Sequence, residues 1–197
     1  MPHTPQSKLW NIPNALSVFR IGTAPILVGL LLRPDEILSI VSALLFLFIC
    51  LTDWLDGYLA RRMNIVTALG KLLDPLADKL LVLTALIMLI PLGRAPAWMV
   101  ALIVGREIGV TGLRAIASDM GIVIAAAPLG KAKTVAQIIA IFALLLHYSY
   151  FGIDFHALGT VVLWIAFGLT IWSGVDYFVK FFRSPVSGGT GSSKEAP

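Results

Sequence analysis

The sequence predicts an all-α membrane protein built from six transmembrane helices. Of its 197 residues, 58% are hydrophobic and only 13% are charged, which is about half the ~25% charged residues of soluble domains. A soluble domain of this length exposes too much surface to hide so much apolar side chain. The single cysteine, Cys50, excludes an internal disulfide. The composition therefore excludes a soluble enzyme, a disordered chain and a disulfide-linked secreted module.

Six apolar segments are each close to the roughly 20 residues that cross a bilayer. Stretches with Pro, Gly or charged residues separate most of them, at 33–36, 91–96, 127–130 and 152–156. A tail rich in Ser and Gly follows at 184–197 and is typical of a flexible end. We therefore expect one six-helix transmembrane catalytic domain over residues 1–183 and a flexible tail over 184–197. The expected spans are 14–32, 37–59, 69–90, 97–119, 131–150 and 157–182.

The charged residues are predicted to gather near one face of the membrane. Successive spans run in opposite directions, so the starts of odd spans and the ends of even spans share a side. Of the 15 Lys and Arg residues, all but Arg33 and Arg94 fall on that side. The positive-inside rule makes it the cytoplasmic side. We expect a multi-pass protein of the cytoplasmic (inner) membrane with both termini inside. The net charge of +4 then suits anionic membrane lipids, and no nucleic acid partner is expected.

Four aspartates form the most informative pattern in the chain. Asp53 and Asp56 are three residues apart near the end of one span, and Asp74 and Asp78 are four apart near the start of the next. Residues at these spacings share a helix face, and the short return between the spans lets the two pairs converge. Unpaired carboxylates at membrane depth are costly, whereas divalent cations such as Mg²⁺ or Mn²⁺ prefer carboxylate oxygens. Two such ions can stabilise phosphoryl displacement.

The residues around the aspartates favour a phosphate ligand. Gly57 and Ala60 continue the face of the first aspartate pair and leave room for a ligand, and Arg61 can pair with phosphate. The alternative is a set of salt bridges between the aspartates and nearby cations. The candidate partners for such bridges are Arg61, Arg62, Lys71 and Lys79.

A second cluster is cationic and enters from the same side. Arg106 and Arg114 are eight residues apart and roughly aligned on one helix. Lys131 and Lys133 enter the next span at the same face, and such a cluster suits a dianionic phosphate. Two alternatives stay open: Arg106 pairs with the neighbouring Glu107 or another acid, and the lysines are interfacial anchors. Arg20, inside the first span, also needs a partner, either a phosphate or an acid.

The stretch 53–78 resembles the signature of the CDP-alcohol phosphatidyltransferase family. That signature reads D-x2-D-G-x2-A-R-x8-G-x3-D-x3-D, and every fixed position matches. The resemblance implies a six-helix membrane fold, two divalent ions (Mg²⁺ or Mn²⁺) and a cytidine-diphosphate lipid as donor. It also implies that Asp78 is the general base. By resemblance, the metal ligands are Asp53, Asp56, Asp74 and Asp78, and the lipid-diphosphate contacts are Gly57, Ala60, Arg61 and Gly70.

Further motifs resemble the bacterial phosphatidylglycerophosphate synthase branch of that family. They lie at 11–20, 106–114 and 130–134, although the run 125–128 lacks a charged residue expected before Leu129. This resemblance implies transfer of a phosphatidyl group from CDP-diacylglycerol to sn-glycerol 3-phosphate, with release of CMP, by a homodimer. The implied contacts to the acceptor phosphate are Arg20, Arg106, Arg114, Lys131, Lys133 and Thr134.

Two other functions compete with this interpretation. A member of the same family could use another acceptor, such as inositol, inositol phosphate or serine. A divalent-cation transporter also carries intramembrane acids, but that function predicts acids through the whole depth of the bilayer. In this sequence the four aspartates lie near one face only.

Overall fold

The computed structural model describes residues 12–33, 35–63, 68–120 and 128–183, with side chains for 18–33, 35–52, 79–120 and 130–183. Within these residues the chain forms six helices and one short hairpin. The helices are α1 (Ile12–Leu31), α2 (Glu36–Met63), α3 (Ala68–Leu89), α4 (Ala97–Asp119), α5 (Pro128–Leu146) and α6 (Phe155–Arg183). The hairpin strands are β1 (Ser149–Tyr150) and β2 (Ile153–Asp154). The expected tail 184–197 lies outside the described residues.

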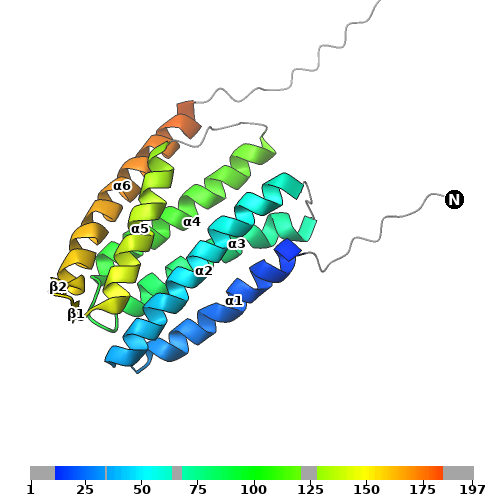
Figure 1. Ribbon diagram of the computed structural model, residues 1–197. Helices are drawn as coiled ribbons and strands as arrows, with labels where there is room; N and C mark the ends of the chain where they lie inside the picture. The colour runs from blue at the N-terminus through cyan, green and yellow to red at the C-terminus, as the bar shows by residue number, and fades with distance from the viewer. Residues whose placement is uncertain (1–11, 34, 64–67, 121–127, 184–197) are drawn as a thin grey trace, which may run out of the picture.

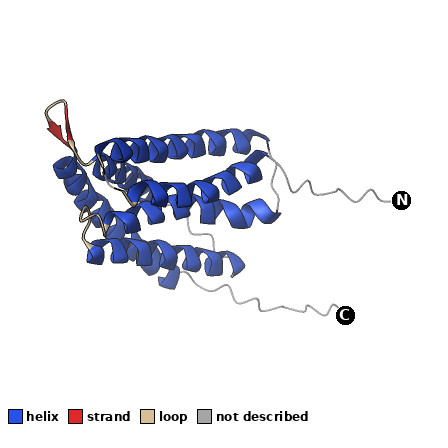
Figure 2. Ribbon diagram, turned by 90° about the horizontal axis from the view of Figure 1, so that it is seen from below, coloured by secondary structure: helices blue, strands red, loops and turns tan. Residues whose placement is uncertain are grey.

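The helices form a bundle with two different ends (Figure 1). The β1–β2 hairpin lies at one end, here called the hairpin end, and Figure 2 shows it projecting from the bundle. The other end, here called the charged end, holds the starts of α1, α3 and α5 and the ends of α2, α4 and α6 (Figure 1). This alternation is the one that the sequence predicts. It brings the segments that carry both clusters to the same end.

A continuous apolar core joins all six helices. Phe46 and Leu86 are fully buried in it, and Leu163 on α6 packs in the same cluster. The helix pairs α5–α6, α1–α3 and α2–α5 pack extensively. α5 and α6 pack tightly at Gly159, where an added Cβ would lie 2.8 Å from Leu144 Cγ. A glycine there lets the two backbones approach each other.

The helix boundaries lie within three residues of the expected spans except at the ends of α2 and α5. α2 continues to Met63, four residues past the expected end at 59. The prediction that the fifth span continues to residue 150 is wrong, because α5 ends at Leu146. His147 takes a left-handed conformation (φ 62°) and donates its backbone N–H to the Ala143 carbonyl at 3.0 Å, as at many helix ends. The hairpin then turns at Phe151 and Gly152, both with positive φ, as type I′ turns require.

Short acidic side chains begin two of the helices. The Asp154 carboxylate accepts a hydrogen bond from the Ala157 backbone N–H at 3.0 Å, and α6 starts directly after it. The Asp35 carboxylate accepts from the Leu38 N–H at 2.7 Å at the start of α2. Each carboxylate satisfies a backbone donor that the first helical turn leaves without a partner. These local sequences therefore fix where the two helices begin.

Arg94, expected as a basic loop residue, is buried at the hairpin end. Its Nη1 donates to the carbonyl oxygens of Leu144 (3.2 Å) and Leu145 (2.9 Å), and its Nη2 donates to Ser39 Oγ at 3.1 Å. Arg94 is 4% exposed, and this burial lowers the pKa of its guanidinium. The side chain thus caps the end of α5 and joins it to α2 and to the α3–α4 connection.

Among the described residues, one helix is both long and apolar enough to cross a membrane. That helix is α6, Phe155–Arg183. Shorter apolar stretches occur at Val18–Leu31, Glu36–Thr52 and Lys79–Leu89. They lie within α1, α2 and α3, the helices that correspond to the first three expected spans.

Candidate active site

The four signature aspartates lie on two helices that are consecutive in the chain. Asp53 and Asp56 belong to the last part of α2, and Asp74 and Asp78 to the first part of α3. Both parts are at the charged end (Figure 1). Their side chains, and those of Gly57, Ala60, Arg61 and Gly70, lie outside the described residues. Among the side chains that the structure describes, no three His, Cys, Asp or Glu residues converge.

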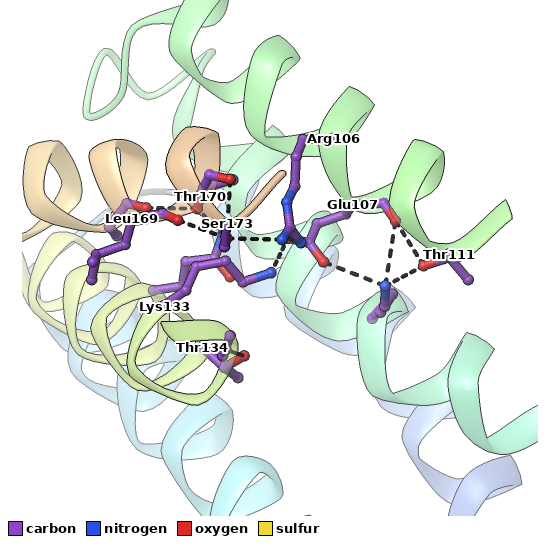
Figure 3. Close-up of polar contacts among 12 residues, drawn as sticks. Arg106, Glu107, Thr111, Lys133, Thr134, Leu169, Thr170 and Ser173 are labelled. Atoms are coloured by element: carbon purple, nitrogen blue, oxygen red, sulfur yellow. Dashed lines mark hydrogen bonds and ion pairs between the residues drawn. The ribbon is translucent and has the colours of Figure 1, made fainter. Parts of the chain in front are cut away.

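The described polar cluster at the charged end is built around Glu107 on α4. Its Oε1 forms ion pairs with the Lys133 ammonium of α5 and with Arg106 Nη1 at 3.2 Å. Its Oε2 lies 3.3 Å from the Lys79 ammonium of α3. Figure 3 shows Arg106, Glu107 and Lys133 meeting where α4, α5 and α6 come together. Three cations from three helices therefore share one carboxylate, which we call the Glu107 cluster.

The last helix positions Arg106. Arg106 Nη2 donates to Ser173 Oγ at 2.8 Å, and the Ser173 hydroxyl itself donates to the Leu169 carbonyl at 2.7 Å (Figure 3). The next residue, Gly174, gives the arginine room, because an added Cβ would lie 3.0 Å from Arg106 Cγ and 3.3 Å from Nε. The Nε itself is buried and has no hydrogen-bond partner among the described residues. Ser173 and Gly174 on α6 thus determine where this guanidinium lies.

Among the side chains that the structure describes, the charges of the Glu107 cluster do not balance. Arg106, Lys133 and Lys79 bring three positive charges to the single negative charge of Glu107. The Lys133 and Glu107 side chains are 6% and 9% exposed, so water screens them weakly. Buried cations in excess of nearby acids attract an anion. The excess of two matches the charge of a phosphate monoester dianion.

The remaining acceptor-side candidates differ in their exposure and in their contacts. Arg114 lies about 12 Å further along α4, at 1.5 Å per residue, and its guanidinium carbon is 5.8 Å from the centre of the Tyr177 ring, a cation–π contact. Lys131 is exposed. Thr134 is exposed, and its hydroxyl donates to the Gly130 carbonyl at 3.1 Å. Arg20 is buried at 8% exposure on α1.

The structure tests the two alternatives for the cationic residues, namely an Arg106–Glu107 pair and lysines that act as interfacial anchors. The ion pair between Arg106 and Glu107 is present, so the first alternative describes a real contact, and the cluster around it still carries excess positive charge. Lys133 is not an exposed anchor, because it is 5% exposed. Lys131 is exposed as an anchor would be. Asp176 and Lys180, four residues apart on α6, form an ion pair at 2.7 Å.

Sequence reasoning missed the parts of the cluster that depend on contacts between helices. It gave no role in the site to Ser173, and it treated Lys79 only as a salt-bridge partner for the aspartates. The central position of Glu107 was also missed. One signal was available, since an acid directly beside Arg106 is rare within an apolar span.

Comparisons with known proteins agree with this geometry. The profile of the family described as CDP-alcohol phosphatidyltransferase matches residues 10–172. A CDP-diacylglycerol–glycerol-3-phosphate 3-phosphatidyltransferase of Bacillus subtilis is 46% identical over 184 residues, covering 87% of this chain and 95% of the relative. A protein of the same name from Rickettsia bellii is 38% identical over 169 residues, covering 85% of this chain and 93% of the relative.

A relative with a different name also matches. A cardiolipin synthase (CMP-forming) of rice is 34% identical over 199 residues, covering 92% of this chain and 60% of the relative. The matches thus extend to relatives whose names specify different products. The family profile itself spans more than three quarters of this sequence. The chain therefore belongs to the CDP-alcohol phosphatidyltransferase family.

Proposed function

We propose that this protein transfers a phosphatidyl group from CDP-diacylglycerol to sn-glycerol 3-phosphate, giving phosphatidylglycerophosphate and CMP. The observation that carries the proposal is the Glu107 cluster, whose excess of two positive charges suits a phosphate dianion. Lys79 of this cluster directly follows Asp78, one of the four signature aspartates, on α3. The names of the relatives from Bacillus subtilis and Rickettsia bellii support this acceptor.

The reaction assigns a separate task to each group of residues. The primary hydroxyl of glycerol 3-phosphate attacks the phosphorus that carries diacylglycerol, and the bond from that phosphorus to CMP breaks. Asp78 accepts the hydroxyl proton as general base. Arg106 and Lys133 hold the acceptor phosphate, with Arg20, Arg114, Lys131 and Thr134 as further candidates. Gly57, Ala60, Arg61 and Gly70 contact the cytidine-diphosphate part of the donor.

The donor set of the signature fits divalent metal ions. Four carboxylates on two successive helices match the preference of Mg²⁺ and Mn²⁺ for hard oxygen ligands. Asp53, Asp56, Asp74 and Asp78 would hold two such ions, which supply positive charge to the diphosphate and to the departing CMP. Asp78 would both hold a metal ion and accept the proton. The proposal therefore makes Asp78 the aspartate at which substitution lowers activity most.

We place this site at the cytoplasmic face of a six-span membrane protein. The antiparallel bundle supports this, because α1 begins and α6 ends at its charged end (Figure 1). Both chain termini would then be cytoplasmic, and the acyl chains of the donor would stay in the lipid beside the helices. Cysteine labelling from either side of membrane vesicles tests the orientation. Labelling of the charged end from outside would contradict it.

Release of CMP from CDP-diacylglycerol in detergent, with Mg²⁺ or Mn²⁺, tests the reaction. We expect turnover with glycerol 3-phosphate, loss of turnover after chelation, and recovery when metal is restored. An Asp78→Asn variant that folds normally should show no measurable turnover. Turnover by that variant would remove Asp78 from the role of base.

A panel of acceptors tests the specificity. It compares glycerol 3-phosphate with inositol, inositol phosphate, serine and phosphatidylglycerol. The last is included because the CMP-forming cardiolipin synthase of rice is also similar to this chain. If another alcohol reacted while glycerol 3-phosphate did not, the proposed acceptor would be wrong and the family chemistry would stand.

A further inference from the structure

Lys79 belongs to the Glu107 cluster, and the proposed reaction gives it no task. It follows Asp78 directly on α3. Its ammonium reaches across to α4, where it forms an ion pair with Glu107 Oε2 at 3.3 Å and hydrogen bonds to the Glu107 carbonyl oxygen at 3.4 Å and to Thr111 Oγ1. The side chain therefore joins the helix of the proposed base to the helix of the proposed phosphate site.

The contacts of Lys79 favour a positioning role over direct binding of substrate. A lysine ammonium has three N–H donors, and three acceptors on α4 lie within reach of it. Thr111 is itself fixed, because its hydroxyl donates to the Glu107 carbonyl at 2.7 Å. Among the described residues, the Lys79 ammonium directs its donors to acceptors on α4.

The contacts of Lys79 matter because α3 and α4 have few other contacts with each other. Packing between α3 and α4 is sparse, whereas α3 packs extensively against α1. The two helices follow each other in sequence and connect at the hairpin end, through residues 90–96. At the charged end, polar contacts from Lys79 take the place of a close apolar interface. Their loss would let the part of α3 around Asp78 and Lys79 shift relative to α4.

We propose that Lys79 is a positioning residue that sets the distance between Asp78 and the acceptor phosphate held by Arg106 and Lys133. The proposal rests on the proposed function and deepens it. Through Glu107, the same carboxylate that orients the phosphate-binding cations also holds the α3 backbone one residue from the base. One ion-pair network thus positions the phosphate-binding cations and the base relative to each other.

Steady-state kinetics of Lys79→Met test the proposal. Methionine keeps an unbranched stem and removes the ammonium. Because a small misplacement of reacting groups costs on the order of 100-fold in rate, we expect kcat to fall at least about tenfold. The KM for glycerol 3-phosphate should stay within about threefold, since Arg106 and Lys133 remain. Lys79→Arg, which keeps the charge, should recover part of the kcat.

Two further variants sharpen the test. Thr111→Val removes one acceptor of the ammonium at nearly constant shape and should lower kcat in the same direction by a smaller factor. Lys180→Met is the matched control, because it removes an exposed ion pair with Asp176 on α6. It should leave both kcat and KM unchanged.

The possible outcomes separate this inference from its alternatives. A raised KM with an unchanged kcat would make Lys79 a direct phosphate ligand and overturn the proposal. Unchanged constants for the folded enzyme, with only a lower Tm, would overturn it in favour of a purely structural contact. If the unmodified protein turned over another acceptor but not glycerol 3-phosphate, the proposed function would fail. The same comparison of variants, run with that acceptor, would still decide the role of Lys79.

Discussion

Each end of the bundle contains an arginine with little exposed surface, and the two are satisfied in different ways. At the hairpin end, Arg94 donates to two backbone carbonyl oxygens and to Ser39. At the charged end, Arg106 shares Glu107 with two lysines. Its Nε is buried without a hydrogen-bond partner among the described residues. The first arginine sits among acceptors that match its donors, and the second sits among cations that outnumber the acid.

The difference distinguishes a structural cation from a binding cation. Fixed carbonyl oxygens at a helix end accept hydrogen bonds from Arg94 without a ligand and hold the helix end in place. Among the described side chains, the Glu107 cluster carries more positive than negative charge, which under the proposed function an acceptor phosphate would offset. Substitutions at the two ends should therefore have opposite signatures, one in stability and the other in kinetics.

The largest expected effect is on catalysis at the charged end. Lys133→Met removes one of the two cations proposed to hold the acceptor phosphate, and Glu107 keeps Arg106 and Lys79 as partners. Loss of one member of a buried charge pair typically costs at least about 2 kcal/mol of binding, so kcat/KM for glycerol 3-phosphate should fall by at least about 30-fold. CMP release at several acceptor concentrations measures this. A variant with normal kcat/KM would place the phosphate elsewhere.

Arg94→Met should reverse this pattern. The substitution leaves two carbonyl oxygens and the Ser39 hydroxyl at the buried end of α5 without their donor. We expect a loss of ~2–3 kcal/mol in the free energy of unfolding, or a Tm lower by roughly 5–10 °C. The kinetic constants of the folded enzyme should be unchanged. Reduced kcat at an unchanged Tm would break the distinction between the two ends.

Gly159→Ala should produce a milder structural defect. The added Cβ would lie 2.8 Å from Leu144 Cγ and 2.9 Å from the Leu144 backbone N. A backbone atom cannot yield as a flexible side chain can, so α5 and α6 must separate slightly. Overpacking of this kind costs ~1–3 kcal/mol, and thermal unfolding in detergent measures it. An unchanged Tm of the variant would show that α5 and α6 can accommodate an added methyl group at this position.

Gly174→Ala is the counterpart on the same helix and should give the smallest effect. Its added Cβ would contact Arg106 Cγ at 3.0 Å, and the flexible arginine can shift away. We expect a Tm close to that of the unmodified protein and a KM for glycerol 3-phosphate raised about two- to fivefold, as for loss of a fraction of a good charge-assisted contact. A lower Tm with an unchanged KM would assign Gly174 to helix packing instead.

The helical parts of the fold are readable from the sequence because each follows from local chemistry. Apolar stretches of span length, interrupted by Pro, Gly and charged residues, give the helices to within a few residues. The β1–β2 hairpin is not readable in this way. Its turn places Phe151 at φ 54°, a conformation normally signalled by Asn or Gly, and its strands are only two residues each.

The site is readable only in part, for a different physical reason. The aspartate signature occupies one continuous stretch, so its spacing alone predicts a shared face. The Glu107 cluster joins residues 28 and 26 positions apart, and the Ser173 contact to Arg106 spans 67 positions. No periodicity specifies which side chains meet across three packed helices. The buried position of Arg94 was missed for the same reason.

The sharing of Glu107 by three cations has an evolutionary consequence. A substitution that moves this one carboxylate moves Arg106, Lys133 and Lys79 together, and Lys79 directly follows Asp78 in the chain. Under the proposed function, a change at Glu107 would therefore disturb both the acceptor site and the base. Selection for a new headgroup would then act on the cations around Glu107 before it acts on Glu107 itself.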